Sequence, residues 1–141
     1  MMNKVSVIIR NKNEEQWIGH AIQSVIDFIP GAEIVVVDNN SVDDSINIVR
    51  HFAKDPNLKN NDITKYTDIK IIKIDEYTPG RSLNLGFKNC SNNICIVLSG
   101  HCVISKIDLT KHIADMKNHV SIFGKQIPVW NGKRITKRYI W

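Results

Sequence analysis

Residues 5–15 read VSVIIRNKNEE, in which a run of mostly β-branched apolar residues is followed at once by a polar loop. A continuous apolar run predicts a strand that is covered on both faces, as in a parallel sheet. Apolar residues then recur at helical spacing, and Glu14 and Glu15 are expected in the first helical turn, where carboxylates favour the helix dipole. These apolar positions are Trp17, Ile18, Ala21, Val25 and Phe28. The stretch therefore predicts a strand, a polar loop and a helix, which ends at Pro30-Gly31.

The alternation of strand and helix continues along the chain. Further strands are predicted at residues 33–37, 69–74 and 94–98, and further helices after a cap at Ser41 or Asp43, at 81–89 and at 107–116. The helix after this cap carries Ile46, Ile48, Val49 and Phe52, and the polar residues 55–67 predict a surface loop. An extended segment at 120–123 precedes a hairpin over 126–139, in which Asn131-Gly132 fits a type I′ turn. We expect one doubly wound α/β domain over residues 1–141, with a mostly parallel sheet and a C-terminal hairpin.

Composition narrows the class of protein. The 141 residues are 43% hydrophobic, and no apolar run approaches the roughly 18 residues that a membrane span needs, so a cytoplasmic protein is expected. Three cysteines, Cys90, Cys95 and Cys102, match no zinc or redox spacing and are predicted to be structural thiols. The net charge of +5 is concentrated after Asp115, where basic residues occur and acidic ones do not. Because few aromatic residues are interleaved with these charges, we predict no nucleic-acid partner. The basic residues then either form a solvated face or contact an anionic partner, such as a membrane surface or a phosphorylated substrate.

Three polar loops are expected to meet at one edge of the sheet. They are Arg10–Asn13, Asp38–Ser41 and Ser99–Cys102, and in doubly wound sheets ligands bind beyond the carboxyl ends of the strands. Arg10 and Lys12, beside a helix N-terminus, suit a phosphate, although the glycine-rich phosphate motifs are missing. Asp38 suits a base imino group or a ribose hydroxyl, or alternatively accepts backbone N–H groups within its own turn.

Four segments in this order resemble glycosyltransferase family 2. They are VSVIIRNKNEEQWIGHAIQSV, EIVVVDNNSVDDS, PGRSLNLGFKNCSNNICIVLSGHC and GKQIPVWNG, and the last is similar to a rhamnosyltransferase-like branch. The resemblance covers nearly the whole chain and implies a GT-A fold, a Rossmann-like architecture that binds a nucleoside-diphosphate sugar. It also implies an inverting transfer of the sugar to a polysaccharide or lipid-linked acceptor.

The resemblance assigns site residues by position. Those implied in binding the nucleotide sugar are Arg10, Asn11, Lys12, Glu14, Asp38, Asn40, Arg81, Asn84, Ser99, Gly100 and His101. Arg81 suits an oxyanion, whereas Asn84 is equally open to being an amide that packs the helix. Family members commonly carry Asp-x-Asp for Mg²⁺ or Mn²⁺ where this chain has Ser99-Gly100-His101. His101 is therefore the one candidate metal ligand, or else a hydrogen-bond donor to the diphosphate.

The second departure from the family is the length of the chain. The carboxylate that deprotonates the acceptor is expected beyond residue 141, and Asp108 and Asp115 are predicted to face solvent. We therefore expect a truncated donor-binding part of the enzyme, with peripheral contact to the inner membrane face through its basic end. The alternatives are an inactive nucleotide-binding or interaction module and, less favoured because its glycine-rich basic signature is absent, a nucleotidyltransferase.

Overall fold

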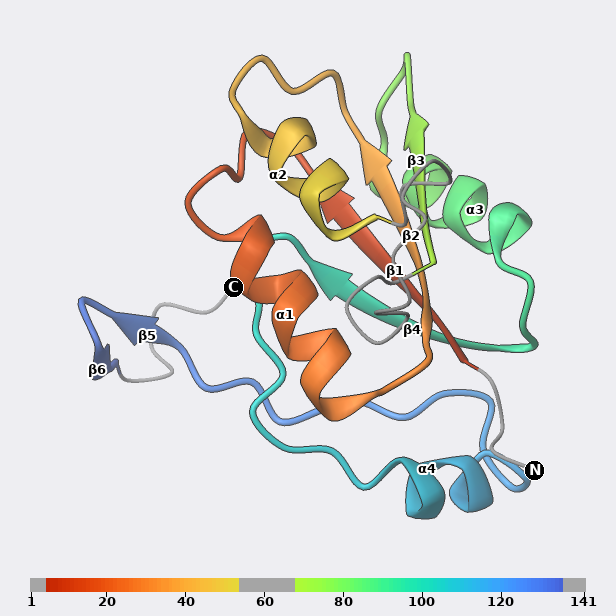
Figure 1. The fold of residues 1–141 in the computed structure, drawn as a ribbon. Helices are drawn as coiled ribbons and strands as arrows, with labels where there is room; N and C mark the ends of the chain where they lie inside the picture. The colour runs from red at the N-terminus through yellow and green to blue at the C-terminus, as the bar shows by residue number, and fades with distance from the viewer. Residues whose placement is uncertain (1–4, 54–67, 136–141) are drawn as a thin grey trace, which may run out of the picture. The chain divides into compact units, whose positions relative to one another are not determined.

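A computed structural model describes residues 5–53 and 68–135, and the chain divides into two compact units, Met1–Ile107 and Asp108–Trp141. The first unit contains a sheet of four parallel strands in the order β3-β2-β1-β4 (Figure 1). The strands are β1 (Val5–Asn11), β2 (Glu33–Asp38), β3 (Ile69–Lys73) and β4 (Ile94–Ser99). The sequence prediction of a parallel sheet is confirmed. The polar loop predicted at 55–67 lies outside the described residues.

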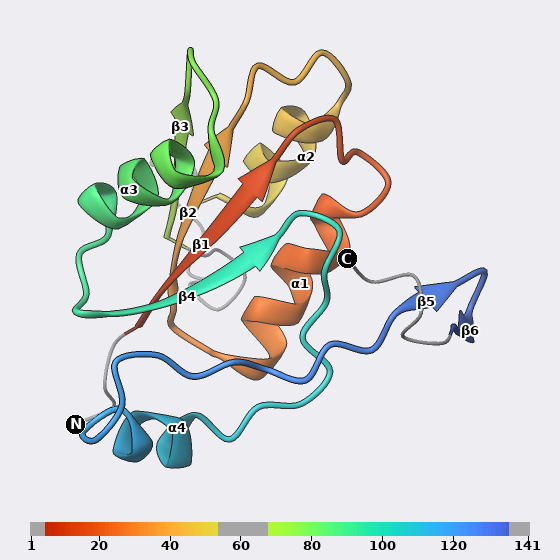
Figure 2. The same cartoon turned by 180° about the vertical axis from the view of Figure 1, so that it is seen from behind.

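The helices of the first unit lie on both faces of the sheet. They are α1 (Ile18–Phe28), α2 (Ser45–Phe52) and α3 (Pro79–Asn89). α1 and α2 pack side by side on one face, and α3 lies on the opposite face against β1 and β2 (Figures 1 and 2). The chain steps from β1 to β2 to β3 in one direction and then returns to the far side of β1. Because crossovers are right-handed, this reversal moves α3 to the other face.

The two central strands form the core. Val7, Ile8 and Ile9 of β1 are fully buried, since helices cover both faces of the sheet. α1 contributes four buried apolar side chains, namely Ile18, Ala21, Ile22 and Val25. Two residues expected on the same face lie at its margin instead, because Trp17 is 50% exposed and Phe28 is 41% exposed.

The helix starts differ from the sequence prediction. α1 begins only at Ile18, so Glu14 and Glu15 lie in the preceding turn, whose N–H groups from Trp17 and Ile18 bond to the Glu14 carbonyl. The expected place of the two carboxylates in the first helical turn is therefore wrong. The cap of α2 is Asp44, without a side-chain capping bond, while Asp43 accepts the N–H of Ser45 at 3.1 Å.

Close approach of α3 to the sheet depends on Gly86. A Cβ placed on this buried glycine would lie 2.6 Å from Cγ2 of Ile8 in β1. The helix itself begins earlier than predicted, at Pro79, and Thr78 caps it by accepting the Arg81 N–H at 3.1 Å. Within the Asn84-Leu85-Gly86 segment, Gly86 therefore allows α3 to pack closely against β1.

The second unit contains one short helix and a hairpin. α4 (Leu109–Asp115) is shorter than predicted and has no buried residue, and its cap is the exposed Asp108. The hairpin joins β5 (Val129–Trp130) to β6 (Lys133–Arg134). Asn131 and Gly132 have φ values of 48° and 72°, as a type I′ turn requires, so the turn and the start of the hairpin are confirmed. Residues 136–139 of the predicted hairpin lie outside the described residues. No strand forms at 120–123, where an extended segment was predicted.

The three cysteines are free and half-buried, in agreement with structural thiols. Burial, together with a hydrogen bond that the Cys95 thiol donates to Cys90, raises the pKa of this thiol to about 12. A thiol with so high a pKa is inert as a nucleophile. Across the described ranges 5–53 and 68–135, no helix is both long enough and apolar enough to cross a membrane.

A buried carboxylate ties the strands together at their amino ends. Glu33 in β2 is 5% exposed and accepts hydrogen bonds from Ser6 at 2.5 Å and from the Ser91 N–H at 2.7 Å. Lys70 of β3 completes the cluster with an ion pair to Glu33 of 2.5 Å. Burial alone would raise the pKa of Glu33, but these bonds outweigh it and lower the pKa from 4.5 to about 2.

This depressed pKa predicts acid sensitivity. The stabilisation from Glu33 is complete above pH 4.5, the unfolded value, and is lost as the pH falls towards about 2. Lys70 is partly exposed, so solvent screens its pair with Glu33. We therefore expect the Glu33 carboxylate to contribute about 2 kcal/mol to the free energy of unfolding. Urea unfolding at pH 7 and pH 3 should show Glu33→Gln destabilised at pH 7 and a clearly smaller difference from wild type at pH 3, where part of the stabilisation is already lost. An equal loss at both pH values would contradict this role.

Candidate functional site

The loops after β1, β2 and β4 meet at the carboxyl edge of the sheet, as the sequence predicted. The Gly100 N–H donates to the Arg10 carbonyl at 2.9 Å, and the Asn39 N–H donates to the Asn11 carbonyl at 3.0 Å. The ladder therefore continues past the strand ends into the loops. This edge lies beside β1, where the strand order reverses, which is the usual ligand position in open α/β sheets.

Asp38 organises two of these loops from a buried position. The residue is 1% exposed, and its carboxylate accepts bonds from Asn11 Nδ2 at 2.9 Å, Ser41 Oγ at 2.6 Å and the Ser41 N–H at 3.1 Å. These contacts are the turn role that was left open as an alternative to reading a base. They account for three acceptor positions of the carboxylate. In this structure Asp38 therefore acts through the loops that it holds.

Lys12 ties the first loop to the second. Its Nζ donates to the carbonyls of Asn39 at 2.7 Å and Asn40 at 2.8 Å. Asn40 has a positive φ of 51°, and its side-chain amide donates to the Ile74 carbonyl at 3.3 Å. The segment after β3 is thereby joined to the same edge.

Two polar atoms near the end of β1 are buried without a hydrogen-bond partner among the described residues. They are Nε of Arg10 and Oδ1 of Asn11. The Arg10 guanidinium reaches the β4 loop only through a long contact, 3.4 Å from Nη2 to Ser99 Oγ. A buried donor or acceptor left unpaired costs about 1–3 kcal/mol, so a ligand that pairs with both would recover that free energy.

His101 is held by Glu14 from the first loop. Nδ1 of His101 lies 2.8 Å from Oε1 of Glu14, and the two side chains are 59% and 22% exposed. Gly100 makes room for this contact, because a Cβ on it would lie 3.2 Å from both Glu14 Cγ and the Arg10 carbonyl oxygen. The pairing joins residues 87 positions apart.

Arg81 and Asn84 lie on α3, apart from these hydrogen-bonded loops. Arg81 is exposed and forms an ion pair with the exposed Glu76. Asn84 is also exposed, so the alternative that its amide packs the helix is wrong. Among the described residues, no hydrogen bond connects either side chain to the three loops.

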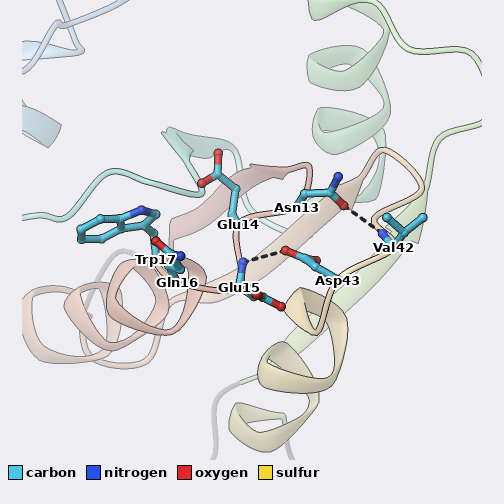
Figure 3. A pocket seen from close by; sticks show the side chains of 7 residues that line it. All are labelled: Asn13, Glu14, Glu15, Gln16, Trp17, Val42 and Asp43. Atoms are coloured by element: carbon cyan, nitrogen blue, oxygen red, sulfur yellow. Dashed lines mark hydrogen bonds between the residues drawn. The ribbon is translucent and has the colours of Figure 1, made fainter.

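A pocket of about 460 Å³ lies beside the site (Figure 3). Its walls are Asn13, Glu14, Glu15, Gln16, Trp17, Val42 and Asp43. It shares Asn13 with the three loops and includes Glu14, which follows the first of them, but it includes neither Arg10 nor His101.

Reciprocal bonds between the first and second loops form the wall of this pocket. The Val42 N–H donates to Asn13 Oδ1, and the Glu15 N–H donates to Asp43 Oδ2, each at 2.9 Å. Burial tends to raise the pKa of Asp43, but bonds from Ser45 and Glu15 lower it overall. Sequence reasoning treated Asp43 only as a helix cap and assigned no role to Asn13. For the positive φ of 53° at Asn13, the sequence offers no signal other than the residue type, since asparagine tolerates that conformation.

The donor set at this edge does not fit a metal held by the protein alone. Within the described segments, no group of three or more His, Cys, Asp or Glu side chains is placed to hold an ion. Asp38 and Glu14 are engaged with Ser41 and His101, which leaves the Asn11 amide oxygen, the Ser99 hydroxyl and one imidazole nitrogen, with no free carboxylate. Mg²⁺ and Mn²⁺ prefer oxygen ligands, above all carboxylates, so we derive no step through a cation.

A parallel sheet in this order, with polar loops gathered beside its first strand, belongs to the GT-A class of folds. The sequence model of glycosyl transferase family 2 matches residues 6–140. The chain therefore belongs to glycosyl transferase family 2, as the resemblance implied. The rhamnosyltransferase-like branch stays a prediction. The comparison with curated proteins found no match.

Solved structures share the fold at low sequence identity. Residues 1–349 of S. aureus TarS in complex with UDP align over 89% of this chain, with a TM-score of 0.64 and 22% identity. A complex of TarS with UDP-GlcNAc gives the same TM-score at 21% identity and the same coverage. The mannosyltransferase PcManGT from Pyrobaculum calidifontis, in complex with GDP-Man and Mn²⁺, aligns over 72% of the chain, with a TM-score of 0.59 and 19% identity. The chain spans 38%, 37% and 28% of these three structures.

Proposed function

We propose that the first unit binds a nucleoside-diphosphate sugar at the carboxyl edge of β1 and β4, as the donor of a glycosyl transfer. The unpaired Arg10 Nε and Asn11 Oδ1 carry this proposal. A nucleotide offers phosphate oxygens for the guanidinium and N–H or hydroxyl donors for the amide oxygen. The three loops are already joined to each other, so ligand binding needs only a movement of the Arg10 and Asn11 side chains that exposes their buried, unpaired atoms.

The family and the solved structures support this ligand class. TarS was crystallised with UDP and UDP-GlcNAc, and PcManGT was solved in complex with GDP-Man. Each is a nucleotide or nucleotide sugar, although the bases differ. For this chain we propose the shared part, a nucleoside diphosphate joined to a sugar, with its phosphates towards Arg10 and His101. Lys12 and Asn40 act indirectly by fixing the loop after β2.

The reaction that we propose is an inverting transfer to a polysaccharide or lipid-linked acceptor. It needs a carboxylate that removes the acceptor proton while the nucleoside diphosphate leaves. The carboxylates of Asp38 and Glu14 at this edge are both held in internal bonds and do not suit that task. We therefore propose that residues 1–141 bind the donor without efficient turnover. A module that holds nucleotide and catalyses nothing is the second candidate, favoured by the same two engaged carboxylates.

Calorimetric titration with UDP, dTDP and GDP, with and without Mn²⁺, tests donor binding. We expect one nucleotide to bind and His101→Ala to weaken its binding about ten-fold, because the ring lies among the three loops. The matched control is His51→Ala, an exposed histidine on α2 with no contact to the site, which should bind as wild type does. Absence of binding by all three nucleotides in both conditions would reject the donor site.

A further inference from the structure

The contact between Glu14 and His101 connects the two loops that flank the end of β1. We infer that Glu14 is a positioning residue: it holds His101 through Nδ1, so that Nε2 is the ring nitrogen presented to the diphosphate of the donor. This inference rests on the proposed function for its ligand, but its structural part concerns the free chain alone. It changes the role expected for Glu14 from contact with the nucleotide sugar to orientation of the imidazole.

The backbone of His101 is fixed on both sides. The Cys102 N–H donates to the Ser99 carbonyl at 2.9 Å, which closes a turn around residues 100 and 101. Two residues later, the Ile104 N–H donates to Oγ of the buried Ser24 in α1 at 3.0 Å. The remaining freedom is rotation of the His101 side chain, and the 2.8 Å contact to Glu14 restricts that rotation.

Glu14 is itself fixed before it reaches the histidine. Its backbone N–H donates to Ser45 Oγ at 2.8 Å, and its carbonyl accepts bonds from Trp17 and Ile18. The side chain then passes Gly100, and its carboxylate points away from Asp43 and Glu15 (Figure 3). A residue larger than glycine at position 100 would occupy this path. The Ser99-Gly100-His101 sequence thus supplies both the anchored ring and the space for its partner.

The contact also selects the protonation pattern of the neutral ring. An ionised carboxylate is only an acceptor, so it pairs with Nδ1 when that nitrogen carries the proton. Nε2 then has its lone pair free, and among the described residues no partner hydrogen-bonds to it. A diphosphate oxygen is also only an acceptor, so direct contact requires that Nε2 take up a proton, whereas a bound cation would accept the lone pair. Carboxylate–histidine pairs of this kind orient the ring when its other nitrogen contacts a ligand.

Nitrogen NMR of the imidazole rings tests the structural part without any ligand. The spectrum is recorded at about pH 8, above the ordinary histidine pKa of about 6.5, and His101→Ala identifies the signals of the ring. We expect protonated Nδ1 in the wild type and a shift towards protonated Nε2 in Glu14→Ala. Glu14→Gln keeps the shape of the side chain but can pair with either tautomer, so a mixture is expected. Glu15→Gln, on the adjacent and separately bonded carboxylate, should leave the pattern unchanged.

Addition of UDP or GDP tests the ligand part, first with EDTA and then with Mg²⁺. We expect Nδ1 of His101 to keep its proton. For direct contact, the Nε2 signal should shift to that of a protonated nitrogen in the EDTA arm; for contact through the cation, it should shift without a proton and only with Mg²⁺. Glu14→Ala and His101→Ala should each weaken binding about ten-fold, and the double variant should show no further loss. Identical ring tautomers in wild type and Glu14→Ala would overturn the positioning role even if nucleotide binds. A fixed tautomer with no nucleotide bound would overturn the ligand part together with the proposed function.

Discussion

Replacement of Asp38 by alanine is expected to lower the free energy of unfolding by about 2–4 kcal/mol and to abolish nucleotide binding. The carboxylate is 1% exposed and accepts the bonds from Asn11 and Ser41 that join the loops after β1 and β2. Its removal leaves buried donors unpaired and weakens the connection between the two loops, which then depends on Lys12 and on backbone bonds. Urea unfolding followed by fluorescence gives the first quantity, and calorimetry at a temperature where the variant remains folded gives the second.

The matched control for Asp38 is Asp44→Ala. Asp44 is the next but one carboxylate along the same segment, is exposed, and makes no capping bond to α2. Its loss should change stability by no more than about 0.5 kcal/mol and leave binding intact. If Asp38→Ala bound nucleotide with wild-type affinity while folded, the loops would not need this carboxylate, and its organising role would be wrong.

Replacement of Gly86 by alanine is expected to destabilise the first unit by about 1–3 kcal/mol. The added methyl group would lie 2.6 Å from Cγ2 of Ile8, a fully buried residue of β1. α3 must therefore shift away from the sheet or strain its contact with β1. The loss is measured as the change in the urea midpoint at constant slope.

Gly80→Ala is the control for this effect on the same helix. No atom lies within 4 Å of a Cβ placed on Gly80, which is exposed in the first turn of α3. Because alanine favours the helix over glycine, this variant should be neutral or stabilised by up to about 1 kcal/mol. Equal destabilisation of both variants would indicate a general effect on the helix and contradict close packing at Gly86.

The order of strands and helices could be predicted because the buried strands are short continuous apolar runs. Residues 5–9 and 33–37 carry that pattern, and the structure places them in the two central strands. The meeting of the three loops could be predicted because the carboxyl ends of parallel strands lie at the same edge of a sheet. Element ends were less predictable, as the turn at Glu14 shows: local bonds to its carbonyl delay α1 until Ile18.

The contacts within the site could not be predicted from the sequence, because they join distant residues. Nothing local to His101 indicates that Glu14, 87 positions earlier, holds its ring. Gly86 could be recognised in the sequence as part of the Asn-x-Gly step. A glycine is needed there because Ile8 of β1 lies next to it, and that contact joins two separate elements. Arg81 has the charge for an oxyanion, yet its nearest partner in the structure is Glu76, a local contact that residue type alone does not reveal.

The central claim is that a nucleoside diphosphate binds where the ends of β1, β2 and β4 meet. Mapping amide chemical shifts of the ¹⁵N-labelled chain during titration with UDP or GDP tests this location directly. We predict the largest changes at residues 10–14, 38–41 and 99–102, with little change at Glu33 and Ser91 on the opposite edge of the sheet. Changes centred on that opposite edge, or none at saturating nucleotide, would contradict the account.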